Sequence, residues 1–141
     1  MKIQKPEILI VDDDVINRKI LRMILRGEAE DVREAENGED AIHILLSNEK
    51  IGIIILDLNM PIMDGYDTIK AIEQNLKLKN RNIAILISSA STLTSFKSKL
   101  EAENIKSDKI KEFFSKPINI DEIKASIKSW TEKIYTSQLI N

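Results

Sequence analysis

Short apolar runs alternate along this chain with longer segments in which apolar residues recur at helical spacing. The runs predict five strands, at residues 7–11, 31–35, 51–56, 83–88 and 111–115. Three of them are continuous in Ile, Leu and Val, which is typical of parallel strands covered on both faces. This alternation predicts an open, doubly wound parallel sheet, in which sites form at the carboxyl ends of the strands.

Five helices are expected between and after these strands. Their apolar positions, spaced by three or four residues, are Ile16, Ile20 and Ile24; Ile42, Leu45 and Leu46; Ile69, Ile72 and Leu76; Leu93, Phe96 and Leu100; and Ile120, Ile123, Ile127, Trp130 and Ile134. The last helix has the clearest beginning, because Asn119 can cap free backbone N–H groups and Glu122 stands at the partner position of a capping box. The predicted fold is a three-layer α/β/α domain built on this sheet.

Length and composition limit the classes of function. The 141 residues are expected to form a single domain, 1–141, with its core at about 7–135. The absence of cysteine and the single histidine, His43, exclude thiolate chemistry and multi-histidine metal sites. The apolar runs are far shorter than the roughly 20 residues of a membrane helix, and three aspartates come too soon for a signal peptide. We therefore expect a cytoplasmic protein without a membrane partner.

Charge is unevenly distributed along the chain. Residues up to Gly65 include 8 basic and 14 acidic side chains, and the remainder includes 13 basic and 9 acidic ones. The later lysines are spread over several segments with few aromatic residues between them, which indicates solvated helix faces. No direct nucleic-acid partner is expected.

Chemically useful side chains follow four of the five predicted strands. They are Asp12-Asp13-Asp14 after the first strand, Asp57 after the third, Ser88-Ser89 at the end of the fourth and Lys116-Pro117 after the fifth. If the first and third strands are neighbours, Asp12, Asp13 and Asp57 converge on one rim, and Ser88 and Lys116 reach it from the other side. The sequence thus predicts an acidic pocket with one cation.

Such a pocket is costly unless a proton or a metal ion fills it, since two carboxylates about 5 Å apart repel by roughly 3 kcal/mol at an effective dielectric of about 20. Oxygen ligands alone favour Mg²⁺, or Mn²⁺ in its place, over zinc. A phosphoryl oxygen commonly completes a magnesium site, and a carboxylate can attack phosphorus to form an aspartyl-phosphate. The metal, a lysine and a hydroxyl would then neutralise charge on the transferring oxygens.

Taken alone, several of these residues have simpler explanations. Asp14 is expected to be the N-cap of the first helix, and Asp64 to mark a turn that begins the third. Lys116 alone would be a surface lysine, and Ser88 a strand-end hydroxyl bonded to backbone. His43 lies off the apolar stripe of its helix and is expected to face solvent. Only the acids, the hydroxyl and the lysine taken together indicate a particular kind of site.

Four motifs in this order resemble the receiver domain of two-component response regulators. They are Ile8-Leu9-Ile10-Val11-Asp12-Asp13, Leu56-Asp57-Leu58-Asn59-Met60-Pro61-Ile62-Met63-Asp64-Gly65, the hydroxyl of Ser88, and Lys116-Pro117. The resemblance covers nearly the whole chain, from about residue 7 to about residue 135. It implies a flavodoxin-like, three-layer α/β/α fold with the strand order 2-1-3-4-5.

The resemblance implies that Asp57 is the phosphoacceptor and takes a phosphoryl group from a phosphohistidine on a histidine kinase or a histidine phosphotransfer protein. It implies that Asp13, Asp57 and the backbone carbonyl of Asn59 bind Mg²⁺ directly, while Asp12 acts through metal-bound water. Ser88 and Lys116 would contact the phosphoryl oxygens. Such a domain catalyses its own phosphorylation and dephosphorylation and is not a turnover enzyme.

The resemblance also implies a switch. Ser88, drawn toward the phosphate, would open space for an aromatic residue three positions before Lys116, which is Phe113 here. The output surface would comprise the fourth helix, the fifth strand and the fifth helix, and would contact a downstream protein. A homodimer that forms on phosphorylation is left open.

The chain departs from the usual pattern at three places. Ser89 stands where alanine is usual, so the choice of Ser88 as the switch hydroxyl rests on counting along the strand. The stretch from Ser88 to Lys116 is several residues longer than is common, so the fourth helix or its following loop should be extended. Phe113 lacks the hydroxyl of the tyrosine often found there, so a switch through it acts by packing alone.

Two other classes of protein fit part of the pattern. A phosphatase of the haloacid dehalogenase type would use Asp12 as its nucleophile, but would need a late acidic pair and would leave Asp57 without a role. A flavodoxin-like cofactor binder needs a Gly, Ser and Thr loop after the first strand, where three aspartates would repel a phosphate. Within the receiver interpretation, the motif from Met60 to Tyr66 slightly favours a phosphorelay or hybrid-kinase receiver over a freestanding regulator.

Overall fold

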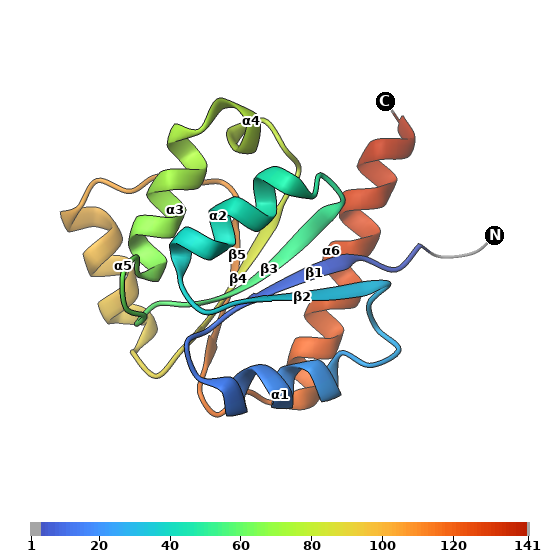
Figure 1. The fold of residues 1–141 in the computed structure, drawn as a ribbon, viewed down its shortest axis with the longest axis horizontal. Coiled ribbons are helices and arrows are strands. Elements are labelled where there is room, and N and C mark those ends of the chain that lie inside the picture. Colours follow the sequence, from blue (N-terminus) through green and yellow to red (C-terminus); the bar gives the residue numbers. More distant parts are fainter. Residues whose placement is uncertain (1–3, 141) are drawn as a thin grey trace.

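The computed structural model describes residues 4–140 (Figure 1). In chain order its elements are β1 (Glu7–Val11), α1 (Val15–Ile24), β2 (Asp31–Ala35), α2 (Gly38–Ser47), β3 (Ile51–Asp57), α3 (Gly65–Gln74), α4 (Leu76–Lys79), β4 (Ala84–Ser89), α5 (Leu93–Ala102), β5 (Ile110–Ser115) and α6 (Ile120–Ile140). The fourth and fifth helices of the sequence prediction are therefore α5 and α6.

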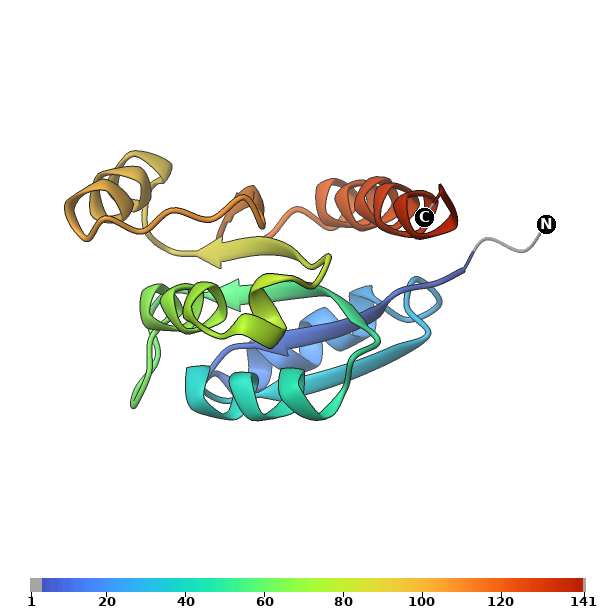
Figure 2. The same ribbon diagram turned by 90° about the horizontal axis from the view of Figure 1, so that it is seen from above.

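The strands form one parallel sheet in the order β2-β1-β3-β4-β5, which confirms the predicted fold class. The central strand β3 is buried over all seven of its residues, as expected for a strand covered on both faces. One apolar core lies between the sheet and helices α2, α3, α4 and α5, and a second lies between the sheet and helices α1 and α6. Figure 2 shows the helices on the two sides of the sheet.

The prediction of five helices missed α4, a four-residue helix that follows α3 directly. Asn75 separates the two, because its side chain accepts hydrogen bonds from the backbone N–H groups of Lys77 and Leu78 and so begins a new helix. Leu76, predicted to face the core in the third helix, is 77% exposed, and Leu78 is fully buried in its place.

The apolar face predicted for the first helix is also partly wrong. Ile16 and Ile20 are 63% and 50% exposed, whereas Leu21 and Ile24 are buried against the sheet together with Arg18. Val15 and Met23 are exposed as well, so α1 carries apolar side chains on its outer face.

The extension expected between Ser88 and Lys116 lies after α5 and not within it. Helix α5 has ten residues, and residues 103–109 connect it to β5. In the part of the chain that the structure describes, no helix has both the length and the apolar character to span a membrane.

The short helix α4 gives a direct test of this packing. Leu78→Ala should lower the free energy of unfolding by about 2–5 kcal/mol, because it removes buried methyl groups and leaves a cavity. Leu76→Ala, two residues away on the exposed side, should change it by less than about 0.5 kcal/mol. Urea denaturation of both variants measures the difference, and equal losses would contradict the assignment of Leu78 to the core.

Candidate functional site

Three aspartates meet at the carboxyl edge of the sheet. Asp12 directly follows β1 and Asp57 ends β3, and these strands are paired with Val11 opposite Leu56. Carboxylate oxygens of Asp12, Asp13 and Asp57 lie within 4.8 Å of one another. Asp12 and Asp57 are buried, whereas Asp13 is exposed. The predicted convergence of these three side chains is confirmed.

Lys116 reaches the same cluster from β5, two strands away from β3. Its backbone N–H donates to the carbonyl of Ser89, which holds the residue at the end of the sheet. Its Nζ lies 3.0 Å from Oδ2 of Asp12 and 3.5 Å from Oδ1 of Asp57. One cation therefore contacts two buried carboxylates, as the sequence predicted.

The charges of the site shift the pKa values of its members. Burial raises the pKa of Asp57, and the nearby charge of Asp12 raises it further, while Lys116 offsets part of this increase. Burial alone would lower the pKa of Lys116, but its hydrogen bond to Asp12 and the charges of Asp12 and Asp57 raise it overall. The site therefore favours the charged form of Lys116 and disfavours the charged form of Asp57.

The two serines at the end of β4 have different environments. Ser88 stands opposite Asp57 in the strand pairing, and its buried hydroxyl has no hydrogen-bond partner within residues 4–140. It lines a cavity of about 390 Å³ together with Asp12 and Lys116. The Ser89 hydroxyl instead accepts a hydrogen bond from the backbone N–H of Ser91 at 3.0 Å. Of the two serines, Ser88 is the one with a hydroxyl free to bind a ligand in this cavity.

The loop after β3 lies close to the Asp57 backbone. The backbone N–H of Asn59 is 3.5 Å from Oδ1 of Asp57, and Asn59 itself is exposed. The N–H of Gly65 donates to the carbonyl of Leu58. A Cβ atom at Gly65 would stand 2.5 Å from the Asp57 carbonyl oxygen, so only glycine permits this close approach.

Phe113 lies on the opposite face of the sheet from the apolar core of α1 and α6. It is half-buried against the core that contains Phe96, with the two ring centroids 5.4 Å apart. Phe96 in turn contacts Tyr66 of α3 at 5.9 Å. The candidate switch residue therefore belongs to a row of three aromatic rings that joins α3, α5 and β5.

Four other residues have the structural roles that the sequence predicted for them, three as helix caps and one as a solvent-facing side chain. The side chain of Asp14 accepts hydrogen bonds from the backbone N–H groups of Ile16 and Asn17, so it is the N-cap of α1. Asp64 caps α3 in the same way, Asn119 accepts from the N–H of Glu122, and His43 is exposed.

Sequence reasoning missed Arg18, a buried side chain whose Nη1 donates to the backbone carbonyl of Asp12 at 2.7 Å. Its place among polar residues gave no sign of burial. The one available signal was its spacing, three residues before Leu21 on the face that packs against the sheet.

The raised pKa of Asp57 leads to a prediction for the metal-free protein. Protonation of Asp57 favours the fold, so its contribution to stability is fully present below its ordinary pKa of about 3.8 and is lost as pH rises through the folded-state pKa. Asp57→Asn removes this loss. It should raise the free energy of unfolding at pH 7 by about 1 kcal/mol, because it removes the burial of a charged carboxylate and its repulsion from Asp12, which Lys116 offsets only in part.

Urea denaturation in EDTA, with wild type and Asp57→Asn compared from about pH 3 to pH 7, measures this difference. The gain should shrink toward zero as pH falls, because Asp57 is then neutral in both states. A variant that is less stable than wild type at pH 7 would contradict the stated balance of charges.

Comparison with known sequences identifies the family. The family model of the response regulator receiver domain matches residues 8–128. The sensor histidine kinase RcsC of Escherichia coli (strain K12) is 30% identical over 131 residues, which are 93% of this chain but 13% of RcsC. The chain likewise spans only 6% of a hybrid histidine kinase of Dictyostelium discoideum that it matches.

Solved structures with the same fold include receiver domains. The signal receiver domain of a LuxO repressor protein from Vibrio parahaemolyticus superimposes with a TM-score of 0.79 at 26% identity, covering 97% of this chain and 98% of that one. The receiver domain of Ssk1 from Saccharomyces cerevisiae, crystallised with the histidine phosphotransfer protein Ypd1, gives a structural match with a TM-score of 0.78 at 24% identity, covering 95% and 94%. The chain belongs to the response regulator receiver domain family.

Proposed function

We propose that Asp57 accepts a phosphoryl group from a phosphohistidine of a histidine kinase or a histidine phosphotransfer protein. The supporting observation is the set of groups around its carboxylate: two further aspartates, the ammonium of Lys116 and the unpartnered hydroxyl of Ser88. Together these groups can bind a metal ion and the oxygens of a phosphoryl group. We place this transfer in the cytoplasm, where the ATP that charges such donors is found.

The residues present fit a magnesium ion. The donors are all oxygens, which Mg²⁺ prefers and zinc does not, and carboxylate oxygens of three aspartates lie within 4.8 Å of one another. Asp13, Asp57 and the backbone carbonyl of Asn59 would hold Mg²⁺, with Asp12 acting through water, and Mn²⁺ could replace it. When bound, the metal neutralises charge on the phosphoryl oxygens.

The transfer makes one bond and breaks one. A carboxylate oxygen of Asp57 attacks phosphorus, the O–P bond forms, and the N–P bond of the donor breaks with its electron pair returning to the imidazole nitrogen. Lys116 and Ser88 bind the phosphoryl oxygens, so charge that develops there is met by an ammonium and a hydroxyl already in place. Attack of water on the same phosphorus would later restore the carboxylate.

Phosphorylation would be transmitted through packing. When the Ser88 hydroxyl turns toward the phosphate, the end of β4 moves, and Phe113 on the neighbouring strand repacks against Phe96. The surface formed by α5, β5 and α6 then changes and binds a downstream protein. Phe113 has no hydroxyl, so this step depends on the fit of its ring alone.

The outer face of α1 suits the donor. Ile16 and Ile20 are exposed on this helix, and Ile20 also borders the cavity that Asp12, Ser88 and Lys116 line. Apolar residues exposed beside a reactive group mark a protein interaction site. The Ssk1 receiver domain was crystallised with a histidine phosphotransfer protein, and we propose that this chain receives its phosphoryl group from a protein of that kind, docked on α1.

The haloacid dehalogenase alternative lacks support in the site. Asp12, its nucleophile, is engaged by Lys116 at 3.0 Å and by the backbone N–H of Asp14 at 2.9 Å. That mechanism would also leave the buried Asp57 beside Lys116 without a role.

Incubation with acetyl phosphate and Mg²⁺, followed by intact mass measurement, tests the proposed function. Wild type should gain the mass of one phosphoryl group, located on Asp57 by peptide mapping, and Asp57→Asn should gain none.

Asp13→Ala should weaken Mg²⁺ binding by at least about tenfold, because groups that only orient a metal ligand already contribute that much. Asp14→Ala is the control and should bind Mg²⁺ nearly as wild type does. Multiple turnover of phosphomonoesters would support the phosphatase instead.

Donor docking on α1 predicts a separate effect. Ile16→Glu and Ile20→Glu should each lower kcat/KM for transfer from a phosphorylated histidine phosphotransfer protein by about tenfold or more, because they place a charge in an apolar contact. Phosphorylation by acetyl phosphate should be unchanged in Ile16→Glu, because Ile16 does not line the cavity of Asp12, Ser88 and Lys116. Leu76→Glu is the control, because Leu76 on α4 is even more exposed than the two isoleucines. An equal loss in this variant would contradict docking on α1.

A further inference from the structure

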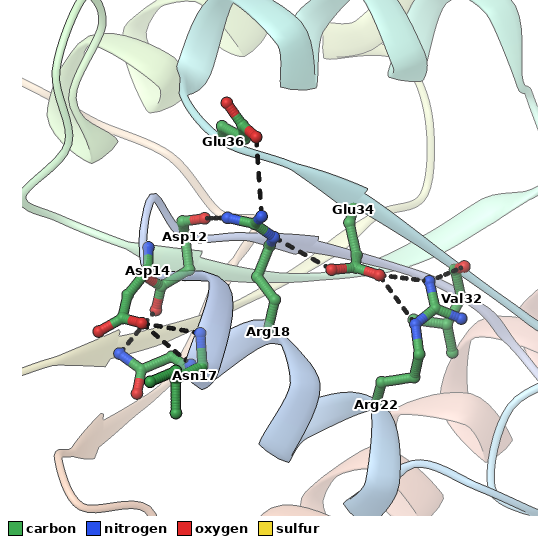
Figure 3. A network of polar contacts seen from close by, with 9 residues as sticks. Asp12, Asp14, Asn17, Arg18, Arg22, Val32, Glu34 and Glu36 are labelled. Carbon is green, nitrogen blue, oxygen red and sulfur yellow. Dashed lines mark hydrogen bonds and ion pairs between the residues drawn. The ribbon is translucent and has the colours of Figure 1, made fainter.

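Arg18 is a buried arginine that joins the acidic loop to the neighbouring strand. Its side chain is 9% exposed. Nη1 donates to the backbone carbonyl of Asp12 at 2.7 Å, and Nε donates to Oε1 of Glu34 at 3.0 Å. Nη2 lies 3.7 Å from Oε1 of Glu36 (Figure 3). One guanidinium thus links the end of β1 to carboxylates on and directly after β2.

The contact with Asp12 is placed where it can control the site. The Asp12 carbonyl belongs to the peptide unit that joins Asp12 to Asp13, so its direction affects the side chains of both residues. On the other side of this peptide, the N–H of Asp14 donates to Oδ1 of Asp12 at 2.9 Å, and Asn17 Nδ2 lies 3.5 Å from Oδ2. Arg18 supplies the hydrogen bond to the backbone itself.

Arginine suits this role because its guanidinium is planar and donates in fixed directions. Glu34 and Glu36 hold the guanidinium from the side away from Asp12, so its orientation does not depend on the acidic cluster. The two glutamates also balance its charge, which would otherwise draw the site carboxylates toward it.

We infer that Arg18 is a positioning residue, which fixes the Asp12–Asp13 peptide so that both carboxylates face the metal site before an ion binds. This inference rests on the proposed function, since it concerns the binding of Mg²⁺ to the same acids. Without Arg18, mutual repulsion would turn Asp12 and Asp13 apart, and part of the binding energy of the ion would be used to bring them back.

Arg22 is a natural control one turn further along α1. Its Nε donates to Oε2 of the same Glu34 at 2.8 Å, and its Nη2 donates to a backbone carbonyl, that of Val32, at 3.0 Å (Figure 3). Arg22 is 49% exposed and has no hydrogen bond to Asp12 in the described structure. Both arginines lie on α1 and contact Glu34 of β2, but only Arg18 also donates to the backbone carbonyl of Asp12 at the end of β1.

Calorimetric titration with Mg²⁺ of wild type, Arg18→Met, Arg18→Lys and Arg22→Met tests the inference, with circular dichroism confirming that each variant is folded. Arg18→Met should weaken Mg²⁺ binding by about 10–100-fold, as for other residues that orient metal ligands. Arg18→Lys should fall between it and wild type, because an ammonium keeps the charge without the fixed directions. Arg22→Met should stay within about twofold of wild type.

The sign of the effect separates positioning from simple electrostatics. Loss of a positive charge near three carboxylates should by itself strengthen Mg²⁺ binding. Weaker binding in Arg18→Met therefore supports positioning, whereas equal or tighter binding overturns it. If wild type neither binds Mg²⁺ nor accepts a phosphoryl group, the proposed function fails and this inference fails with it.

A measurement on wild type covers the case in which Arg18→Met does not fold. In nuclear magnetic resonance spectra of the metal-free protein, the guanidinium protons of Arg18 should be protected from exchange, while those of the half-exposed Arg22 should exchange rapidly. Arg18 protons that exchange as rapidly as those of Arg22 overturn the inference without any substitution.

Discussion

Three carboxylates held within 4.8 Å of one another, with one lysine among them, set the requirements that the surrounding structure has to meet. Their repulsion, roughly 3 kcal/mol for a pair at this distance, opposes folding, so the backbone that carries them must be fixed by other interactions. The parallel sheet provides this, because β1 and β3 are buried between two apolar cores and end side by side. The electrostatic repulsion among the carboxylates is therefore opposed by the burial of β1 and β3, which keeps the backbone of the site in place.

The opposite charge comes from a different part of the sheet, and this has a consequence for signalling. Lys116 follows the edge strand β5, whereas Asp57 ends the central strand β3, and β4 with Ser88 lies between them. A phosphoryl group bound by Asp57, Ser88 and Lys116 would tie three adjacent strands together. Under the proposed function, an adjustment at the site would therefore be passed to β5, where Phe113 packs against Phe96.

The sequence predicted the strands and their polar ends well, because continuous Ile and Leu runs that stop at Asp12, Asp57 or Ser88 mark both the strand and its carboxyl end. The buried faces of the helices were harder to predict. On α1, Ile16 and Ile20 have the same spacing as core residues, and periodicity alone does not say which of two apolar faces the sheet covers. The choice between Leu76 and Leu78 depended on Asn75, whose capping begins a new helix. The burial of Arg18 depends on its contacts with the Asp12 carbonyl and with Glu34 of the neighbouring strand, and helical periodicity alone does not predict these contacts.

Helix α1 links the two halves of the proposed function. Its inner face carries Arg18, which donates to the Asp12 carbonyl, and its outer face carries Ile16 and Ile20, of which Ile20 borders the cavity. Ten residues of helix span about 15 Å, short enough to move as one body. A donor that docks on the outer face therefore contacts the same rigid element that orients the acids on the inner face. The exposed isoleucines do not contribute to the core, and under the proposed function they would contact the donor. Their exposure and the burial of Arg18 follow from one orientation of the helix.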